Sequence, residues 1–142
     1  MKLVETVLKG KFDVYIDPEL KYNQEKKYLT HKFINFCIDE LEITGKFKTK
    51  IVSEREKYGI KTTAYYRVND KELVVYGKNR MLGDVFRSIA HELTHKKQYE
   101  DNKVKHPVQD VGGDIEDEAN AKAGAIIKRF IKYDEDGSKV FY

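Results

Sequence analysis

Apolar and polar residues follow one another in periods that predict both strands and helices. Residues 11–16 alternate as in a short strand, and the Asp-Pro pair directly after them ends it. From about Asn23 to Ile43 the apolar residues recur near helical spacing, which predicts a long helix closed by Gly45. Residues 46–53 alternate again and predict a second strand.

The second half of the chain predicts a hairpin followed by two helices. The runs 61–68 and 72–76 are rich in threonine, tyrosine and valine, and a turn-type Asn-Asp-Lys sequence separates them. Helical periodicity then predicts a helix from about residue 83 or 84 to 99 and a last helix from about 114 to 133. A polar loop over residues 101–113 joins the two helices.

These elements predict an α+β fold, with residues 1–142 forming a single domain. We expect a small antiparallel or mixed sheet with a β-hairpin at its edge. The sheet should pack against the helix of residues 84–99, a C-terminal helix and an N-terminal helix. The tail, 134–142, is expected to be an extended or loose end.

Composition narrows the function classes. Of 142 residues 36% are charged, the net charge is +3 and no long basic block occurs, which disfavours nucleic-acid binding without excluding it. The single cysteine, Cys37, lies in an apolar run and is interpreted as a buried small hydrophobe in a reducing compartment. With no secretory signal or membrane-spanning run in the sequence, we expect a soluble, cytoplasmic monomer. His31 is expected to be structural or to lie on the surface.

Two histidines, His91 and His95, stand four residues apart in the predicted helix of residues 84–99. They project from one face, one turn apart, and can both bind a zinc ion at about 2.0–2.1 Å. Glu92 stands about 100° round the helix, where its carboxylate can reach a metal-activated water without binding the metal. The alternative is a pair of solvent-facing histidines. The motif lies off the apolar stripe of this helix, which consists of Leu82, Val85, Phe86, Ile89 and Leu93.

A catalytic zinc site needs a third protein ligand. The metzincin pattern is absent, because Asp101 stands where its third histidine would be. His106 in the loop is one candidate, and the acids Asp114, Glu116 and Glu118 of the last helix are others. The expected buried face of that helix is Ala119, Ala123, Ile126, Ile127 and Phe130.

Helical geometry favours Glu116 among these acids. Glu116 points along the face that packs against the protein, whereas Glu118 and Asp114 point away from it. A carboxylate facing a core is costly unless it is paired or bound to a metal. The alternative is a first-turn acid that the helix dipole favours.

The motif residues resemble those of a known family. His-Glu-Leu-Thr-His, followed after twenty residues by Glu-Asp-Glu-Ala-Asn from Glu116 to Asn120, resembles the gluzincin zinc peptidases. The run from Glu116 to Ala123 is also similar to the ImmA/IrrE metallopeptidases of phages and mobile elements. Residues 63–66 and 74–77 are similar to the hairpin of thermolysin-like enzymes. The resemblance covers about residues 60–131, which would form the zincin core.

The resemblance implies a role for each matching position. His91, His95 and Glu116 would bind one zinc ion, Glu92 would be the general base, and Asn120 would orient His91. Residues Ala64, Tyr65 and Tyr66 would form the edge strand that pairs with an extended substrate. No histidine follows Glu116, so the oxyanion-stabilising histidine of larger gluzincins has no counterpart. The remaining candidate donors are Tyr65, Tyr66, Tyr99 and His106.

The sequence therefore predicts a zinc-dependent endopeptidase with a protein or peptide substrate, in the cytoplasm of a prokaryote or a phage-infected host. One alternative is a Spartan-like protease of DNA-bound proteins with His106 as third ligand, although Pro107 replaces the usual glycine. Others are a non-catalytic zinc-binding phage or regulatory protein and a metal-free helical interaction domain. Residues 138–142 are a further candidate, as an inhibitory segment in the cleft.

Overall fold

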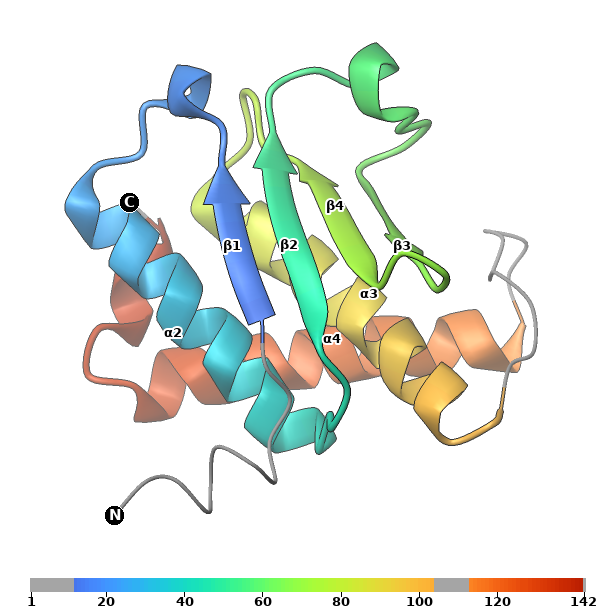
Figure 1. The fold of residues 1–142 in the computed structure, drawn as a ribbon. Coiled ribbons are helices and arrows are strands. Elements are labelled where there is room, and N and C mark those ends of the chain that lie inside the picture. The colour runs from blue at the N-terminus through green and yellow to red at the C-terminus, as the bar shows by residue number, and fades with distance from the viewer. Residues whose placement is uncertain (1–11, 104–112, 142) are drawn as a thin grey trace.

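The computed structural model describes residues 12–103 and 113–141, and their fold is α+β, as predicted (Figure 1). A four-stranded mixed sheet comprises β1 (Phe12–Ile16), β2 (Phe47–Val52), β3 (Ala64–Arg67) and β4 (Glu72–Tyr76). The α-helices among the described residues are α2 (Gln24–Leu41), α3 (Leu82–Glu100) and α4 (Asp114–Tyr133).

The strands lie in the order β1-β2-β4-β3, so β3 is an edge strand. β1 pairs parallel with β2, and β2 pairs parallel with β4. The first parallel pair needs a crossover, which α2 provides. β3 and β4 form the predicted antiparallel hairpin, with Ala64 opposite Val75. Because β3 pairs only with β4 among the described strands, it lies at the edge of the sheet, where it contacts α3.

α2 begins as the sequence predicts but ends earlier. The side chain of Asn23 accepts a hydrogen bond from the Lys26 amide at 2.8 Å and caps the helix. The prediction that Gly45 closes the helix is wrong. Glu42 takes up the left-handed conformation, with φ of 54°, and its N–H bonds to the carbonyl of Ile38. A non-glycine residue thus makes the turn that the pattern assigned to a glycine.

The core lies between the sheet and the helices. Phe33, Phe86 and Phe130 come from α2, α3 and α4, and Phe33 stacks on Phe86 with ring centroids 4.4 Å apart. Cys37 is fully buried, as predicted. The predicted apolar stripe of α3 is also buried throughout: Leu82, Val85, Phe86, Ile89 and Leu93. Because this stripe fixes the rotation of α3, the motif histidines face another direction.

The C-terminal segment is packed rather than loose, so that prediction is wrong. Residues Gly137–Phe141 form a 3-10 helix, and Val140 is only 1% exposed. A Cβ atom at Gly137 would lie 2.3 Å from the Phe130 carbonyl oxygen, so this close approach to α4 requires glycine. Lys32 of α2 adds an ion pair to Asp134 at 2.8 Å. These contacts hold the segment against α4.

None of the helices in the described ranges has the length and apolarity that a membrane span requires.

We expect Phe33→Ala to lower the free energy of unfolding by about 3–5 kcal/mol, because it empties the centre of the aromatic cluster. Tyr28→Ala, on the same helix but 57% exposed, should cost under about 1 kcal/mol. Urea denaturation measures both. Similar losses for the two variants would contradict the core described above.

Candidate metal centre

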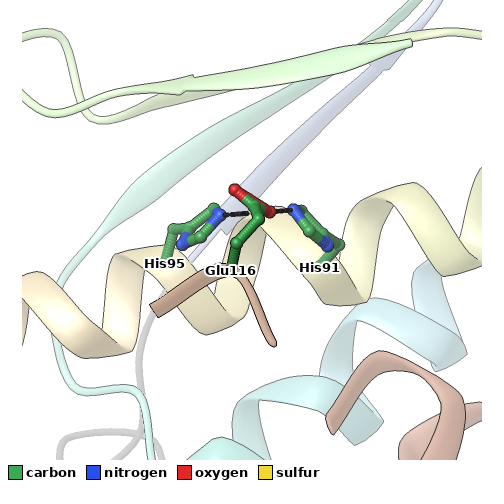
Figure 2. Close-up of side chains that lie close together, drawn as sticks. All are labelled: His91, His95 and Glu116. Carbon is green, nitrogen blue, oxygen red and sulfur yellow. Dashed lines mark hydrogen bonds and ion pairs between the residues drawn. The ribbon is translucent and has the colours of Figure 1, made fainter. Parts of the chain in front are cut away.

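The two motif histidines and Glu116 meet between α3 and α4. Figure 2 shows the Glu116 carboxylate between the two imidazoles. His95 is 3% exposed, Glu116 is 8% exposed and His91 is partly exposed. Of the His, Cys, Asp and Glu side chains in the described residues, these three form the one group that could hold a metal ion. The structure thus brings together the three residues that the sequence predicted as ligands.

Two of the three distances between the donor atoms fit a single tetrahedral ion. The Nε2 atoms of His91 and His95 are 3.2 Å apart, and His95 Nε2 is 3.3 Å from Glu116 Oε1. A tetrahedral ion with bonds of about 2.0–2.1 Å separates its ligand atoms by about 3.3 Å. The third separation, from His91 Nε2 to Glu116 Oε1, is shorter at 2.5 Å, since these two groups pair directly.

The second carboxylate oxygen of Glu116 gives an independent test of the fit. Glu116 Oε2 is buried and has no hydrogen-bond partner among the described residues. A buried, unsatisfied carboxylate oxygen is costly in free energy. A divalent cation bound to Glu116 would offset that cost, so the residues present suit a metal ion.

The electrostatics of His91 also favour metal binding. Burial lowers the pKa of His91, the nearby Glu116 charge opposes that shift, and His95 adds to it. The net result is a pKa below the usual value of 6.5. The imidazole is therefore neutral near pH 7, which is the form that binds a metal.

Gln98 fixes the orientation of His95. The Gln98 amide nitrogen donates to the Ile115 carbonyl at 3.1 Å and to Glu118 Oε1 at 2.8 Å. Both partners can only accept, so the amide oxygen of Gln98 must face His95 Nδ1, 2.7 Å away. Nδ1 then carries the proton, and Nε2 presents its lone pair to the metal position.

Sequence reasoning missed this pair of contacts. Gln98 stands three residues after His95, so its helical spacing was an available signal. Glu118 was predicted to point away from the packed face. It is partly exposed but still reaches Gln98, and this contact lowers the pKa of the Glu118 carboxyl. The contact depends on how α4 docks on α3, which no local pattern encodes.

A pocket of about 440 Å³ opens beside His91 and Glu116. Its walls are residues 62–64, Arg80, one face of α3 between Asp84 and Glu92, and Glu116 and Asn120 of α4. Glu92 therefore lines the same cavity as His91 and Glu116. The side chain of Asn120 hydrogen-bonds to that of His91, and this contact raises the pKa of His91 against the effect of burial.

Of the proposed substrate contacts, the structure brings only Ala64 into the pocket wall. Tyr65 lies on the sheet face away from the helices, where its hydroxyl donates to the Tyr58 carbonyl at 2.6 Å. Tyr66 lies on the helix side near Lys96, and burial raises its pKa to about 12. Strand alternation separates the two tyrosines, since neighbouring residues face opposite sides.

The other candidates within the described residues take no part in the group. Tyr99 does not line the pocket, and Asp114 is exposed at the start of α4. His31 is exposed and lies against the ring of Phe12, 4.7 Å away, as expected for a surface histidine. His106 lies outside the described residues. No residue of the segment 134–141 lines the pocket.

Arg80, Arg87 and Ser88 also line the pocket, and sequence reasoning did not single them out. Arg87 and Ser88 stand four and three residues before His91, so helical spacing places them on its face of α3. Arg80 precedes the helix, and no spacing rule indicates its position.

Comparison of the chain with protein-family models, with curated proteins and with solved structures found no match.

We expect Glu116→Ala to lower zinc affinity by more than about 100-fold, which exceeds the effect of losing an outer contact. Asp117→Ala changes the neighbouring, exposed acid of the same turn and should leave the affinity unchanged. Competition with a chromogenic chelator measures both constants. Equal affinities for the two variants would remove Glu116 from the metal centre.

Gln98→Leu should weaken zinc binding by about 10–100-fold, because His95 loses the acceptor that selects its tautomer. Nitrogen NMR shifts of the His95 ring in the metal-free protein should then report a mixture of tautomers. The control is Gln24→Leu, an exposed residue at the start of α2. Unchanged affinity and a single tautomer in Gln98→Leu would refute this role.

Proposed function

We propose that the protein is a zinc-dependent endopeptidase, with one zinc ion held by His91, His95 and Glu116. The observation that carries the proposal is the convergence of these three donors beside a pocket whose wall also contains Glu92. Three protein donors leave a coordination position for water or substrate, as catalytic zinc sites require.

Two features favour zinc over other ions: the three candidate ligands and the nearby carboxylate of Glu92. Two imidazoles and one carboxylate suit zinc, but the same donor set also binds Fe(II) in oxygenases. Glu92 supports the hydrolytic alternative, since it places an acid–base group in the wall that holds two of the ligands. The metal content of the purified protein distinguishes the two.

In the proposed mechanism the residues of the chain position the reactants and move protons. When bound, zinc supplies Lewis acidity that lowers the pKa of water and polarises a carbonyl group. The Glu92 carboxylate accepts the proton of the attacking water and delivers it to the nitrogen of the leaving amine. Gln98 and Asn120 keep the two imidazoles in place through their hydrogen bonds.

The sheet edge supports a peptide as the substrate. β3 is the last strand of the sheet and pairs only with β4 among the described strands. An extended peptide can add to such an edge through main-chain hydrogen bonds. Ala64, the first residue of β3, lines the pocket together with His91, so a peptide on this edge would pass the metal position.

Glu92→Gln should abolish peptide hydrolysis while one equivalent of zinc stays bound, because the variant loses the proton acceptor but no ligand. His91→Ala should lose both. The measurements are cleavage of a quenched fluorescent peptide library and metal content by mass spectrometry. Glu56→Gln, at an exposed position of the 3-10 helix Glu56–Tyr58, is the control and should match the parent.

The mechanism is wrong if Glu92→Gln cleaves the library at the parent rate. A zinc-loaded parent protein that cleaves nothing would instead favour a non-catalytic zinc site.

A further inference from the structure

The pocket wall on the N-terminal side of the metal ligands carries two guanidinium groups, Arg80 and Arg87. We propose that this wall binds a carboxylate of the substrate, either an Asp or Glu side chain beside the scissile bond or the C-terminal carboxylate of a short peptide. The inference rests on the proposed peptidase function and specifies its substrate.

Arg80 is held in place with donors to spare. Its Nη1 donates to the Tyr76 carbonyl at 2.8 Å, and its Nη2 donates to the Asp84 carbonyl and to Ser88 Oγ, each at 2.9 Å. A guanidinium has five N–H donors. Two donors therefore have no partner among the described residues, and the three bonds pre-organise the group at the pocket wall.

The partners of Arg80 do not neutralise its charge. They are two carbonyls and a hydroxyl, and within the described ranges neither Arg80 nor Arg87 forms an ion pair with a carboxylate. Partial burial lowers the pKa of Arg80, although a guanidinium stays charged at any physiological pH. The Asp84 carboxylate attracts Arg80 without forming an ion pair with it, and desolvation outweighs this attraction, so an incoming anion relieves the remaining cost.

Arg87 brings the second positive charge from the exposed side of the pocket. It stands one turn before His91 on the same face of α3. A Cβ atom built at Gly124 of α4 would lie 3.7 Å from Arg87 Nη1, so the guanidinium lies against α4. Arg80 and Arg87 thus both line the pocket, with Arg80 held by β4 and α3 and Arg87 lying beside α4.

The charge balance of the pocket favours an anion once a divalent ion is bound. The two charges of the ion would be matched by Glu92 and Glu116. Away from the metal ligands, Arg80 and Arg87 share the pocket lining with one acid of the described residues, Asp84, which leaves one net positive charge among these three. Because a peptidase substrate offers its negative charge as carboxylate groups, a carboxylate is the ligand that this wall suits. The planar guanidinium of Arg87 can bind it with two parallel hydrogen bonds, and each spare N–H of Arg80 can add a single bond.

The test is a binding experiment with the zinc-loaded Glu92→Gln protein, which should not hydrolyse its ligand. Fluorescent peptides are compared in pairs that differ only by Glu or Gln at each position flanking a cleavage site, all with amidated C-termini. A second pair carries Gln throughout and differs only in a free or amidated C-terminus. We expect one acidic position, or the free C-terminus, to tighten binding by about tenfold, as for a hydrogen bond to a charged group.

Adding Arg87→Gln should remove this preference, and adding Lys128→Gln should preserve it. Lys128 is an exposed cation of α4 outside the pocket lining, so it controls for general electrostatic attraction. A carboxylate that binds directly to zinc would keep its advantage in the Arg87→Gln background, and that outcome would overturn the proposal. Equal affinities within every pair would overturn it as well.

The two proposals fail separately. If the parent protein cleaves no peptide but still prefers the acidic member of a pair in an Arg87-dependent way, the carboxylate subsite stands and the peptidase function fails. Because such a protein provides no cleavage site, the Glu and Gln pairs are then compared at every position along a test peptide. If the protein cleaves peptides with no preference for a carboxylate, the peptidase function stands and the subsite is refuted.

Discussion

The candidate site depends on one constraint, the packing of α4 against α3. The apolar stripe of α3 binds it to the core and leaves its other face to α4. Ala119 and Ala123 lie buried on α4, and such small side chains allow two helices to approach closely. That approach carries the Glu116 carboxylate to within hydrogen-bonding distance of both imidazoles. Without it, the motif would be two histidines on a helix surface.

The same packing explains why part of the site was predictable. His91, Glu92 and His95 are related by helical spacing alone, so the sequence places them relative to one another. Glu116 could be chosen because the apolar face of α4 fixes its rotation. The expected positions Ala119, Ala123, Ile126 and Phe130 are buried, whereas Ile127 is partly exposed. The α+β class and the hairpin could likewise be inferred, because both depend on local periodicity.

Features that depend on tertiary contacts escaped the sequence. The end of α2 at Glu42 required an energetically unusual backbone conformation, which a rule based on glycine cannot anticipate. The C-terminal segment was predicted to be loose because its packing depends on Gly137 fitting closely against the Phe130 carbonyl of α4, a contact that periodicity does not reveal. Arg80 reaches the pocket only because the hairpin and α3 are adjacent, and its position has no signature in the order of residues.

The bridge made by Gln98 couples two events that are usually considered separately. One amide group orients His95, a candidate metal ligand, and also joins α3 to the first turn of α4, through Ile115 and Glu118. If an ion binds there, its occupancy and the docking of these helices are linked equilibria. By mass action, metal that binds only the docked arrangement also stabilises it. The ion would thus serve as a structural cross-link as well as a reactive centre, and resistance to unfolding or proteolysis would rise and fall with the supply of free metal in the surroundings.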